Sequence, residues 1–361
     1  MRMLKPVTNF YTRFEHPISS LFLIFGFVFD ALTLKRVDTL WENLWIVSYL
    51  IIIGAFIAFI HIREDKSGGE KNLTKAHFWS VNILQFAFGG VFSAYLVLYF
   101  RSADIMVAWP FIALLATIFI ANEFFKKHYV RLGLQISLYF LAIYSFMIFL
   151  MPVILHKIGS WIFLLSGLLS LLLITLFIKV LFRFTKDKFA KSKRLVIFLI
   201  SSIFILVNLL YFLNLIPPIP LSLKDVGMYH TVHKTEHGYV IIDEEHSWKD
   251  YFNLYPDFNK TPNSSIYAFS AVFSPKNLDI TILHEWQRYD EKGEKWITES
   301  IIHLPVIGGR DRGFRTYSKR SNLAAGKWRV NVKTEEGKLI GRMRFTIVLV
   351  DTNPPLKILI K

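Results

Sequence analysis

The chain has 361 residues, no cysteine and a formal net charge of +15 at pH 7. The lack of cysteine excludes disulfides, thiolate metal sites and a cysteine nucleophile. Hydrophobic residues make up 53% of the sequence, and most of them precede residue 217. The remainder has the composition of a soluble domain, so we predict two domains, over residues 1–216 and 217–361.

The positive charge is also uneven between the two parts. Residues 1–216 contain 21 Lys/Arg and 10 Asp/Glu, whereas residues 217–361 contain 21 and 17. A basic chain often binds nucleic acid. Here most of the excess lies in the apolar part, where loops that face the cytoplasm explain it better.

The first part contains seven apolar stretches of the length, about 20 residues, that a helix needs to cross a bilayer core. We predict seven transmembrane helices, at residues 17–34, 41–62, 77–100, 103–122, 132–155, 160–182 and 195–216. The first and fourth stretches are the least uniform, because they contain Asp30 and Pro110. No cleavable signal peptide is recognised, since no small-residue cleavage site follows the first stretch.

Loops rich in Lys and Arg alternate along the chain with loops that contain few of them. The N-terminus holds three Lys or Arg, the second loop four and the fourth loop three. The sixth loop, together with the end of the helix before it, holds seven, which makes 17 in all. The first, third and fifth loops together hold four. Loops rich in Lys and Arg stay in the cytoplasm. We therefore predict a cytoplasmic N-terminus and, after seven spans, a C-terminal domain outside the cytoplasm.

Several polar side chains fall within these stretches. We expect Asp30, His61 and Glu123 to reach the membrane interface. Four amide side chains lie deeper in these stretches, and interhelical hydrogen bonds are the simplest role for them. They are Asn82, Gln85, Gln135 and Asn208. A transport pathway is the alternative for such residues. The sequence shows no inverted repeat and no pair of interrupted helices of the kind that transporters use.

After "PPIP" at 217–220, which ends the last helix, the apolar period changes to two. "MRFTIVLV" places Met343, Phe345, Ile347 and Leu349 on one face, and "KWRVNVK" places Trp328, Val330 and Val332 on one face. "TEEGKLIG" indicates a hairpin in which Gly337 adopts positive φ. We count seven or eight strands and predict an all-β antiparallel sandwich.

The most basic stretch is "GGRDRGFRTYSKR" at 308–320. One hypothesis is an anion site, because guanidinium groups bind phosphate or carboxylate in a bidentate manner. Its residues are Arg310, Arg312, Arg315, Tyr317 and Lys319. The other hypothesis is structural: a glycine-rich turn leads into a strand, and Arg315, Tyr317 and Lys319 share its solvated face, opposite Phe314 and Thr316. Glu285, Glu299 or a carboxylate of another strand would then supply the counter-charge.

Six histidines fall in the second domain: His230, His233, His237, His246, His284 and His303. With Asp243, Glu244 and Glu245 they raise a zinc hypothesis, since imidazole and carboxylate suit that ion. The spacing opposes it, because His230 and His233 point to opposite faces of a strand. No HExxH pattern occurs, and we predict no metal and no cofactor.

Three stretches, "ILHEWQRYD", "GGRDRGFRTYSKR" and "GKWRVNVKTEEGKLIGRMRFTIV", resemble the bacterial domain of unknown function 2914 (DUF2914). The matching positions are His284, Trp286, Gly309, Arg310, Arg315, Ser318, Lys319, Trp328, Arg329 and Gly341. The resemblance implies a small extracytoplasmic β-domain behind a multi-span region in the bacterial inner membrane. It implies no activity, because the family has none assigned.

We expect a binding protein whose outer domain recognises an anionic envelope glycan or lipid, or a protein partner, while the helices anchor it or pass a signal. We predict no nucleic-acid partner, because a domain outside the cytoplasm does not meet cytoplasmic DNA or RNA. The alternative is a membrane enzyme or transporter of a lipid or glycan, working through polar residues between the helices. We identify no catalytic residues, since the sequence contains no GxSxG, P-loop or GxGxxG pattern.

Overall fold

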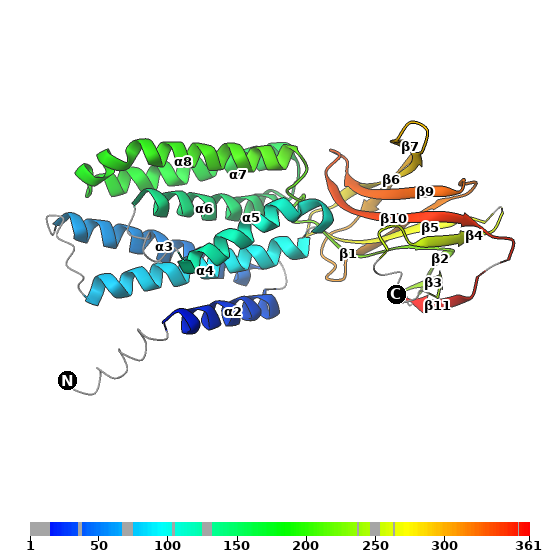
Figure 1. The fold of residues 1–361 in the computed structure, drawn as a ribbon, viewed down its shortest axis with the longest axis horizontal. Helices are drawn as coiled ribbons and strands as arrows, with labels where there is room; N and C mark the ends of the chain where they lie inside the picture. Colours follow the sequence, from blue (N-terminus) through cyan, green and yellow to red (C-terminus); the bar gives the residue numbers. More distant parts are fainter. Residues whose placement is uncertain are drawn as a thin grey trace. The chain divides into compact units, whose positions relative to one another are not determined.

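A computed structural model describes residues 15–34, 38–66, 75–102, 105–124, 132–236, 238–245, 253–262, 264–352 and 354–361. The chain divides into two compact units, Met1–Arg101 with Val107–Ile216, and Ser102–Met106 with Pro217–Lys361. Helices make up the first unit, and strands make up the second (Figure 1).

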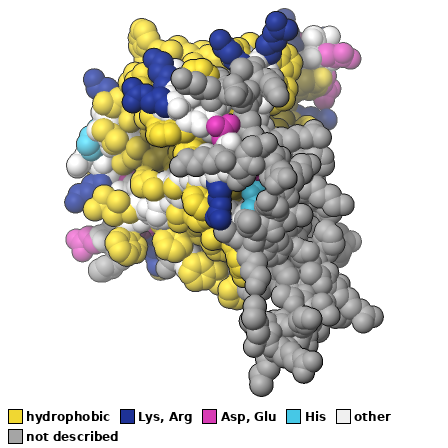
Figure 2. All heavy atoms as spheres, turned by 90° about the vertical axis from the view of Figure 1, so that its left-hand side faces the viewer, with side chains coloured by type: hydrophobic (Ala, Val, Ile, Leu, Met, Phe, Trp, Pro, Cys, Tyr) yellow, Lys and Arg dark blue, Asp and Glu magenta, His cyan; other side chains and the backbone are white. Residues whose placement is uncertain are grey.

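Within the described residues, the helical unit contains α2 (Glu15–Thr33), α3 (Leu40–Lys66), α4 (Lys75–Ser102), α5 (Ile105–Phe124), α6 (Leu132–Leu155), α7 (Ser160–Phe182) and α8 (Lys186–Phe212). Five of them, α3, α4, α6, α7 and α8, are long and apolar enough to cross a membrane. In α2 and α5 the described apolar segments are shorter, Ile24–Thr33 and Ala108–Ala121. Figure 2 views this unit from one side, where apolar side chains surround scattered Lys and Arg.

The last helix does not end at the prolines. We predicted it at 195–216, but α8 ends at Phe212 because Asn214 adopts a left-handed conformation with φ of 60°. The Leu215 N–H then donates to the Leu210 carbonyl over 2.9 Å. Such a closure satisfies carbonyls that the helix end leaves without a partner.

Glycine allows aromatic rings to approach two of the helices. A Cβ at Gly54 of α3 would lie 2.8 Å from the Tyr139 Oη of α6. A Cβ at Gly167 of α7 would lie 2.9 Å from the Tyr144 Oη. Small residues let membrane helices pack closely, and that is the role of both glycines here.

The second unit is rich in antiparallel β-structure. Its described strands are β1 (Ser222–Tyr229), β2 (Thr231–Thr235), β3 (Gly238–Glu244), β4 (Asp257–Lys260), β5 (Ile266–Phe273), β6 (Ile280–Asp290), β7 (Lys295–Val306), β8 (Phe314–Arg320), β9 (Gly326–Thr334), β10 (Leu339–Leu349) and β11 (Leu356–Ile360). They form three sheets, in the orders β1-β5-β8, β4-β10-β9-β6-β7 and β11-β3-β2. The β4–β10 pair is parallel, and the other pairs are antiparallel.

Our count of seven or eight strands was too low, since eleven are described. β2, β4 and β11 have only four or five residues each, too few to show a clear alternation. In β9 the apolar residues Trp328, Val330 and Val332 are buried as predicted, but Asn331 on the opposite face is buried as well. The alternation holds in β10 until its end, where Leu349 is exposed. Gly337 has φ of 80° in the hairpin between these strands, as the sequence predicts.

The three sheets share apolar contacts. Tyr229, Val232, Ile241, Phe269 and Ala271 form one buried cluster, which joins β1 and β5 of the first sheet to β2 and β3 of the third. On the other side, buried side chains of β6 meet those of β5 and β8. The first sheet therefore has partners on both faces, and this fixes which side chains of β8 are exposed.

Candidate functional site

The basic stretch begins with a turn that requires glycine. Gly309 and Gly313 have φ of 89° and 80°, which other residues rarely adopt. A Cβ at Gly308 would lie 2.0 Å from the Pro275 carbonyl oxygen, and one at Gly313 would lie 2.9 Å from the Ala271 carbonyl carbon. The glycine-rich turn of the structural hypothesis is therefore present, and it leads into β8.

Side chains alternate along β8 as that hypothesis predicts. Thr316 and Ser318 are buried, Arg315 and Tyr317 are half-buried, and Lys319 is exposed. The face of β8 with Tyr317 is partly covered, because the Tyr239 ring of β3 lies edge-on to the Tyr317 ring, with 6.3 Å between the ring centroids. The Tyr239 hydroxyl also donates to the Arg315 carbonyl over 3.1 Å. Tyr317 thus packs against β3 and offers only part of its ring to a ligand.

The cations of the stretch contact rings. The Arg310 guanidinium lies 4.7 Å from the Phe314 ring centroid, and the Lys319 amine lies 5.5 Å from that of Tyr267. Burial raises the pKa of Tyr239, and the positive charges of Arg310 and Arg315 oppose that rise. These charges therefore act on the same small region of surface.

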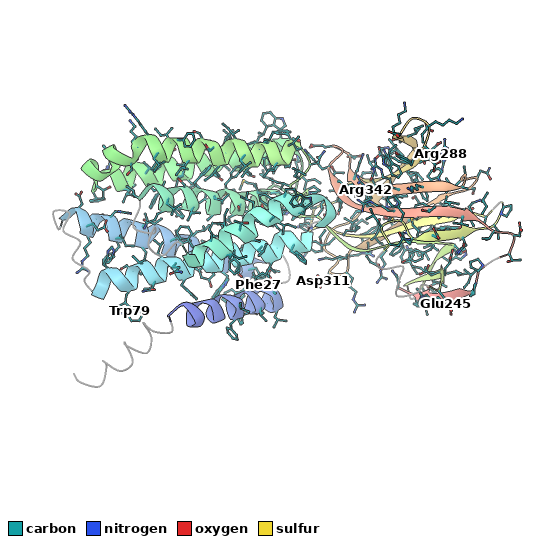
Figure 3. The ribbon with its side chains drawn as sticks, viewed as in Figure 1. Phe27, Trp79, Glu245, Arg288, Asp311 and Arg342 are labelled. Carbon is teal, nitrogen blue, oxygen red and sulfur yellow. The ribbon has the colours of Figure 1, made fainter. Side chains whose placement is uncertain are left out.

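The two carboxylates suggested as counter-charges are engaged elsewhere. Glu285 contacts the Lys333 amine at 2.5 Å. Glu299 pairs at 3.2 Å with Arg288, which is labelled in Figure 3. Among the described residues, no ion pair joins Arg310, Arg312, Arg315 or Lys319 to a carboxylate. The structural hypothesis thus lacks the neutralising partner that it named.

Three of the family positions form a buried link between sheets. The ring nitrogens of His284 on β6 lie 2.9 Å from the hydroxyls of Ser270 on β5 and Ser318 on β8. The Trp286 indole N–H also donates to Ser318, over 3.0 Å. Burial lowers the pKa of His284 to about 3, so the ring is neutral at physiological pH. His284 therefore has a structural role, which satisfies buried polar groups between two sheets.

Two further motif positions, Trp328 and Arg329, lie on opposite faces of β9. Trp328 is 2% exposed and its indole N–H donates to the Ala324 carbonyl over 2.9 Å. Arg329 points the other way, where its Nε donates to the Gln287 side-chain oxygen over 2.6 Å. Its guanidinium lies 4.2 Å from the Trp296 ring centroid.

The sequence analysis missed the network around Arg329. Asn331 and Gln287 are buried, and the Asn331 amide donates to Gln287 over 3.1 Å and to Glu285 over 2.8 Å. The Nε of Arg342, a residue labelled in Figure 3, donates to the Asn331 side-chain oxygen over 2.5 Å. In the sequence, polar residues alternate with Trp328 and its apolar neighbours, and this pattern was the available signal for a polar face on β9. Alternation alone does not predict which residues of neighbouring strands lie opposite each other.

The described histidines of the β unit do not assemble a metal site. His230 Nε2 lies 2.9 Å from Glu244, which also accepts two bonds of 2.8 Å from the backbone and side-chain N–H groups of Asn259. Burial would raise the pKa of Glu244, but these bonds hold it below its ordinary value. His237 and His246 lie outside the described residues. Within the described part, no group of three His, Asp or Glu residues is arranged to hold a metal ion.

Polar residues of the helical unit are buried within it. Asp30 and His61, which we expected at the interface, are 5% and 1% exposed. His61 Nε2 lies 2.8 Å from the Gln135 side-chain oxygen, and the Asn208 amide donates to the Tyr144 hydroxyl over 3.1 Å. The predicted interhelical hydrogen bonds are therefore present for Gln135 and Asn208, and those of Asn82 and Gln85 stay predictions. The Glu123 side chain lies outside the described residues.

Residues 279–347 match a protein family described as "Protein of unknown function (DUF2914)". The C-terminal region contains a DUF2914 segment. His284, Trp286, Ser318, Trp328 and Arg329 all fall within it, as does the whole basic stretch. The DUF2914 segment thus contains the network around Arg329 and, apart from Ser270, the buried link.

Other comparisons add little to the DUF2914 match. No curated protein matches the chain. A β-glucosidase from Listeria innocua in complex with glucose is 8% identical with a TM-score of 0.19, and the match covers 25% of this chain and 15% of that one. Pseudomonas fluorescens alkylpurine DNA glycosylase AlkC bound to DNA is 8% identical with a TM-score of 0.22, covering 85% and 98%. TM-scores this low do not assign a fold.

Proposed function

We propose that the chain is a membrane-anchored binding protein whose β unit recognises an anionic envelope ligand through Arg310, Arg312, Arg315 and Lys319. The supporting observation is that these four cations lie close together in the chain and that none is paired with a carboxylate in the described structure. A phosphate or carboxylate group would supply the missing charge. An anionic glycan or lipid carries such groups, and an acidic protein partner is the alternative.

The proposal includes a topology. We propose seven transmembrane helices in the bacterial inner membrane, a cytoplasmic N-terminus, and a β-sandwich outside the cytoplasm. Five helices with the length and composition of a span support the helical part. Contacts from β6 to β5 and β8 support two layers packed face to face.

Reporter fusions at Lys66, Lys188 and Lys361 test this topology. We expect a cytoplasmic signal at the first two positions and an external signal at the third, because Lys and Arg are concentrated in alternate loops. A cytoplasmic signal at Lys361 would refute the external location of the β unit and, with it, the choice of envelope ligands.

Binding is measured with the full chain in a non-ionic detergent, against phosphatidylglycerol vesicles and against polygalacturonate. We expect the double variant Arg312→Ala/Arg315→Ala to lose affinity for at least one of them. Binding of the native chain should weaken with salt, since the Debye length falls to about 8 Å at 0.15 M. Lys292→Ala/Lys295→Ala removes the same charge from two exposed positions elsewhere and should bind normally. A double variant that loses stability but keeps its affinity would refute the proposal.

A membrane enzyme or transporter is the second candidate, and the burial of Asp30 and His61 supports it. Ionisable groups inside a membrane protein commonly mark a substrate or proton pathway. Replacing the chromosomal copy separately by Asp30→Asn and by Arg312→Ala/Arg315→Ala discriminates the two. A deletion phenotype reproduced by Asp30→Asn alone would favour the second candidate.

A further inference from the structure

The strand β11 exposes an apolar face at the edge of the third sheet. Leu356, Ile358 and Ile360 are 40%, 71% and 75% exposed. Alternate residues of a strand share a face, and the register of β11 with β3 places Ile358 and Ile360 beside Ile242 and Val240. These two side chains are half-buried. The outer face of this edge therefore offers five neighbouring apolar side chains to a partner.

The backbone of β11 is open on the side that faces away from β3. Tyr239 and Lys361 exchange both of their backbone hydrogen bonds, each over 2.9 Å. Hydrogen-bonded and non-hydrogen-bonded pairs alternate along an antiparallel ladder. The odd-numbered residues of β11 therefore bond to β3, whereas the N–H and C=O groups of its even-numbered residues point away. Among the described strands, β11 ends the order β11-β3-β2, so these groups form an open edge (Figure 1).

Other strands at the ends of the sheets have features that discourage pairing with a further strand. β4 has only four residues, and β1 and β7 each contain a bulge. β8 and β2 carry the exposed side chains of Lys319 and Lys234. Short length, bulges and charges protect an edge in this way. The cation of β11, Lys357, shares the inner face with Leu359, which packs against the buried cluster of the first and third sheets.

The open edge is complementary to a second copy of itself. When two β11 strands pair in an antiparallel manner about Ile358, this residue lies opposite its own copy, and Leu356 lies opposite Ile360. The outward N–H and C=O groups of the two strands then face one another, and each such pair exchanges two hydrogen bonds. The apolar side chains also meet across the strands, which is a favourable contact. Lys357 lies opposite Leu359, so like charges are not directly opposed.

We propose that the β unit forms a two-fold symmetric dimer in which β11 of one copy pairs with β11 of a second copy. The two three-stranded sheets become one sheet that ends at a β2 strand on each side. This assembly is closed, because both copies use the same surface. A lipid surface is the competing occupant, but hydrocarbon leaves open backbone groups without a partner. The dimer goes beyond the proposed function and does not depend on the stretch at 308–320.

The oligomeric state of the full chain in non-ionic detergent is measured by size-exclusion chromatography with light scattering, over a range of concentrations. We expect a dimer whose dissociation constant rises at least tenfold in Ile358→Lys, because like charges then lie opposite each other. Ile301→Lys adds the same charge at a side chain of β7 that is 50% exposed, and should stay within twofold of the native value. If Ile358→Lys fails to fold, Ile360→Lys decides by the same criterion. A monomeric native chain, or a dimer that these changes at β11 leave intact, overturns the proposal.

Cysteine cross-linking tests the register, since the native chain contains no cysteine. Ile358→Cys should cross-link to its own copy with a short bis-maleimide. Leu356→Cys and Ile360→Cys, expressed together with different tags, should cross-link to each other more efficiently than either does to itself. Ile301→Cys is the exposed control and should remain uncross-linked. Equal cross-linking of Ile301→Cys, or no preference for the mixed pair, overturns the pairing about Ile358.

A fluorescence measurement distinguishes the second copy from lipid. Ile358→Cys is labelled with an environment-sensitive fluorophore, and the full chain is placed in bilayer nanodiscs that hold either one or two copies. We expect a polar environment with one copy and an apolar environment with two. An apolar environment with a single copy would identify lipid as the occupant and overturn the dimer.

Discussion

The buried ring of His284 should make the stability of the β unit depend on pH. The ordinary pKa of histidine is 6.5, and burial lowers that of His284 to about 3. Below pH 6.5 the unfolded chain binds a proton that the folded chain excludes, so folding becomes less favourable as pH falls. The slope approaches about 1.4 kcal/mol per pH unit between these pKa values. From pH 7 to pH 5, His284 alone should remove about 2 kcal/mol of unfolding free energy.

His284→Gln is the matched variant, because its amide can donate and accept hydrogen bonds but does not titrate in this range. Hydrogen exchange of β6 and β9 amides, followed by mass spectrometry on the full chain in detergent, reports the opening free energy. The difference between native and variant chains cancels the titration of all other groups. We expect this difference to change by about 2 kcal/mol between pH 7 and pH 5. Parallel pH profiles would show that His284 can be protonated in the folded chain and would refute the reasoning.

The same exchange measurement tests three further changes. Trp328→Ala should cost about 3–5 kcal/mol, because the ring is buried and its indole N–H loses the Ala324 carbonyl; a loss under 1 kcal/mol would contradict the buried position. Glu244→Gln should cost about 1–3 kcal/mol at pH 7, since it weakens charge-assisted bonds with His230 and Asn259. That cost should shrink as pH falls below 4.5, the ordinary pKa of the carboxyl, because the carboxyl of the unfolded chain gains a proton there before that of the folded chain does. Gly308→Ala should destabilise the turn before β8 because the added Cβ meets the Pro275 carbonyl; an unchanged exchange rate there would show that the turn can shift at no cost.

The helices were the part of the fold most accessible to sequence analysis. The bounds of α6 and α7, Leu132–Leu155 and Ser160–Phe182, agree with the predicted stretches, because each apolar run ends at polar or glycine residues. α8 begins earlier than predicted, since its first turns are charged and hydropathy does not detect them. A transmembrane pattern therefore locates the apolar centre of a helix better than its polar ends.

Strand pairing was less accessible, because partners lie far apart in sequence. The alternation in β9 and β10 was visible, but the parallel pairing of β10 with β4 was not. A bulge after Trp286 places Gln287 opposite Thr298. Register of this kind determines which polar groups meet, and local patterns do not specify it. The anion hypothesis at 308–320 came from composition alone, whereas the network around Arg329 required the cross-strand contacts.

The link from His284 to Ser270 and Ser318 also has a consequence for how the exposed surface can vary. A shift of β8 by one residue would turn Ser318 away from His284 and leave the ring without that partner, while Lys319 or Tyr317 would enter the core. The buried link thus selects a single alignment of β8. Positions 315, 317 and 319 can then change in sequence while the backbone beneath them stays in place. The strand thus has an inner row of side chains that the link restricts and an outer row that is free of this restriction.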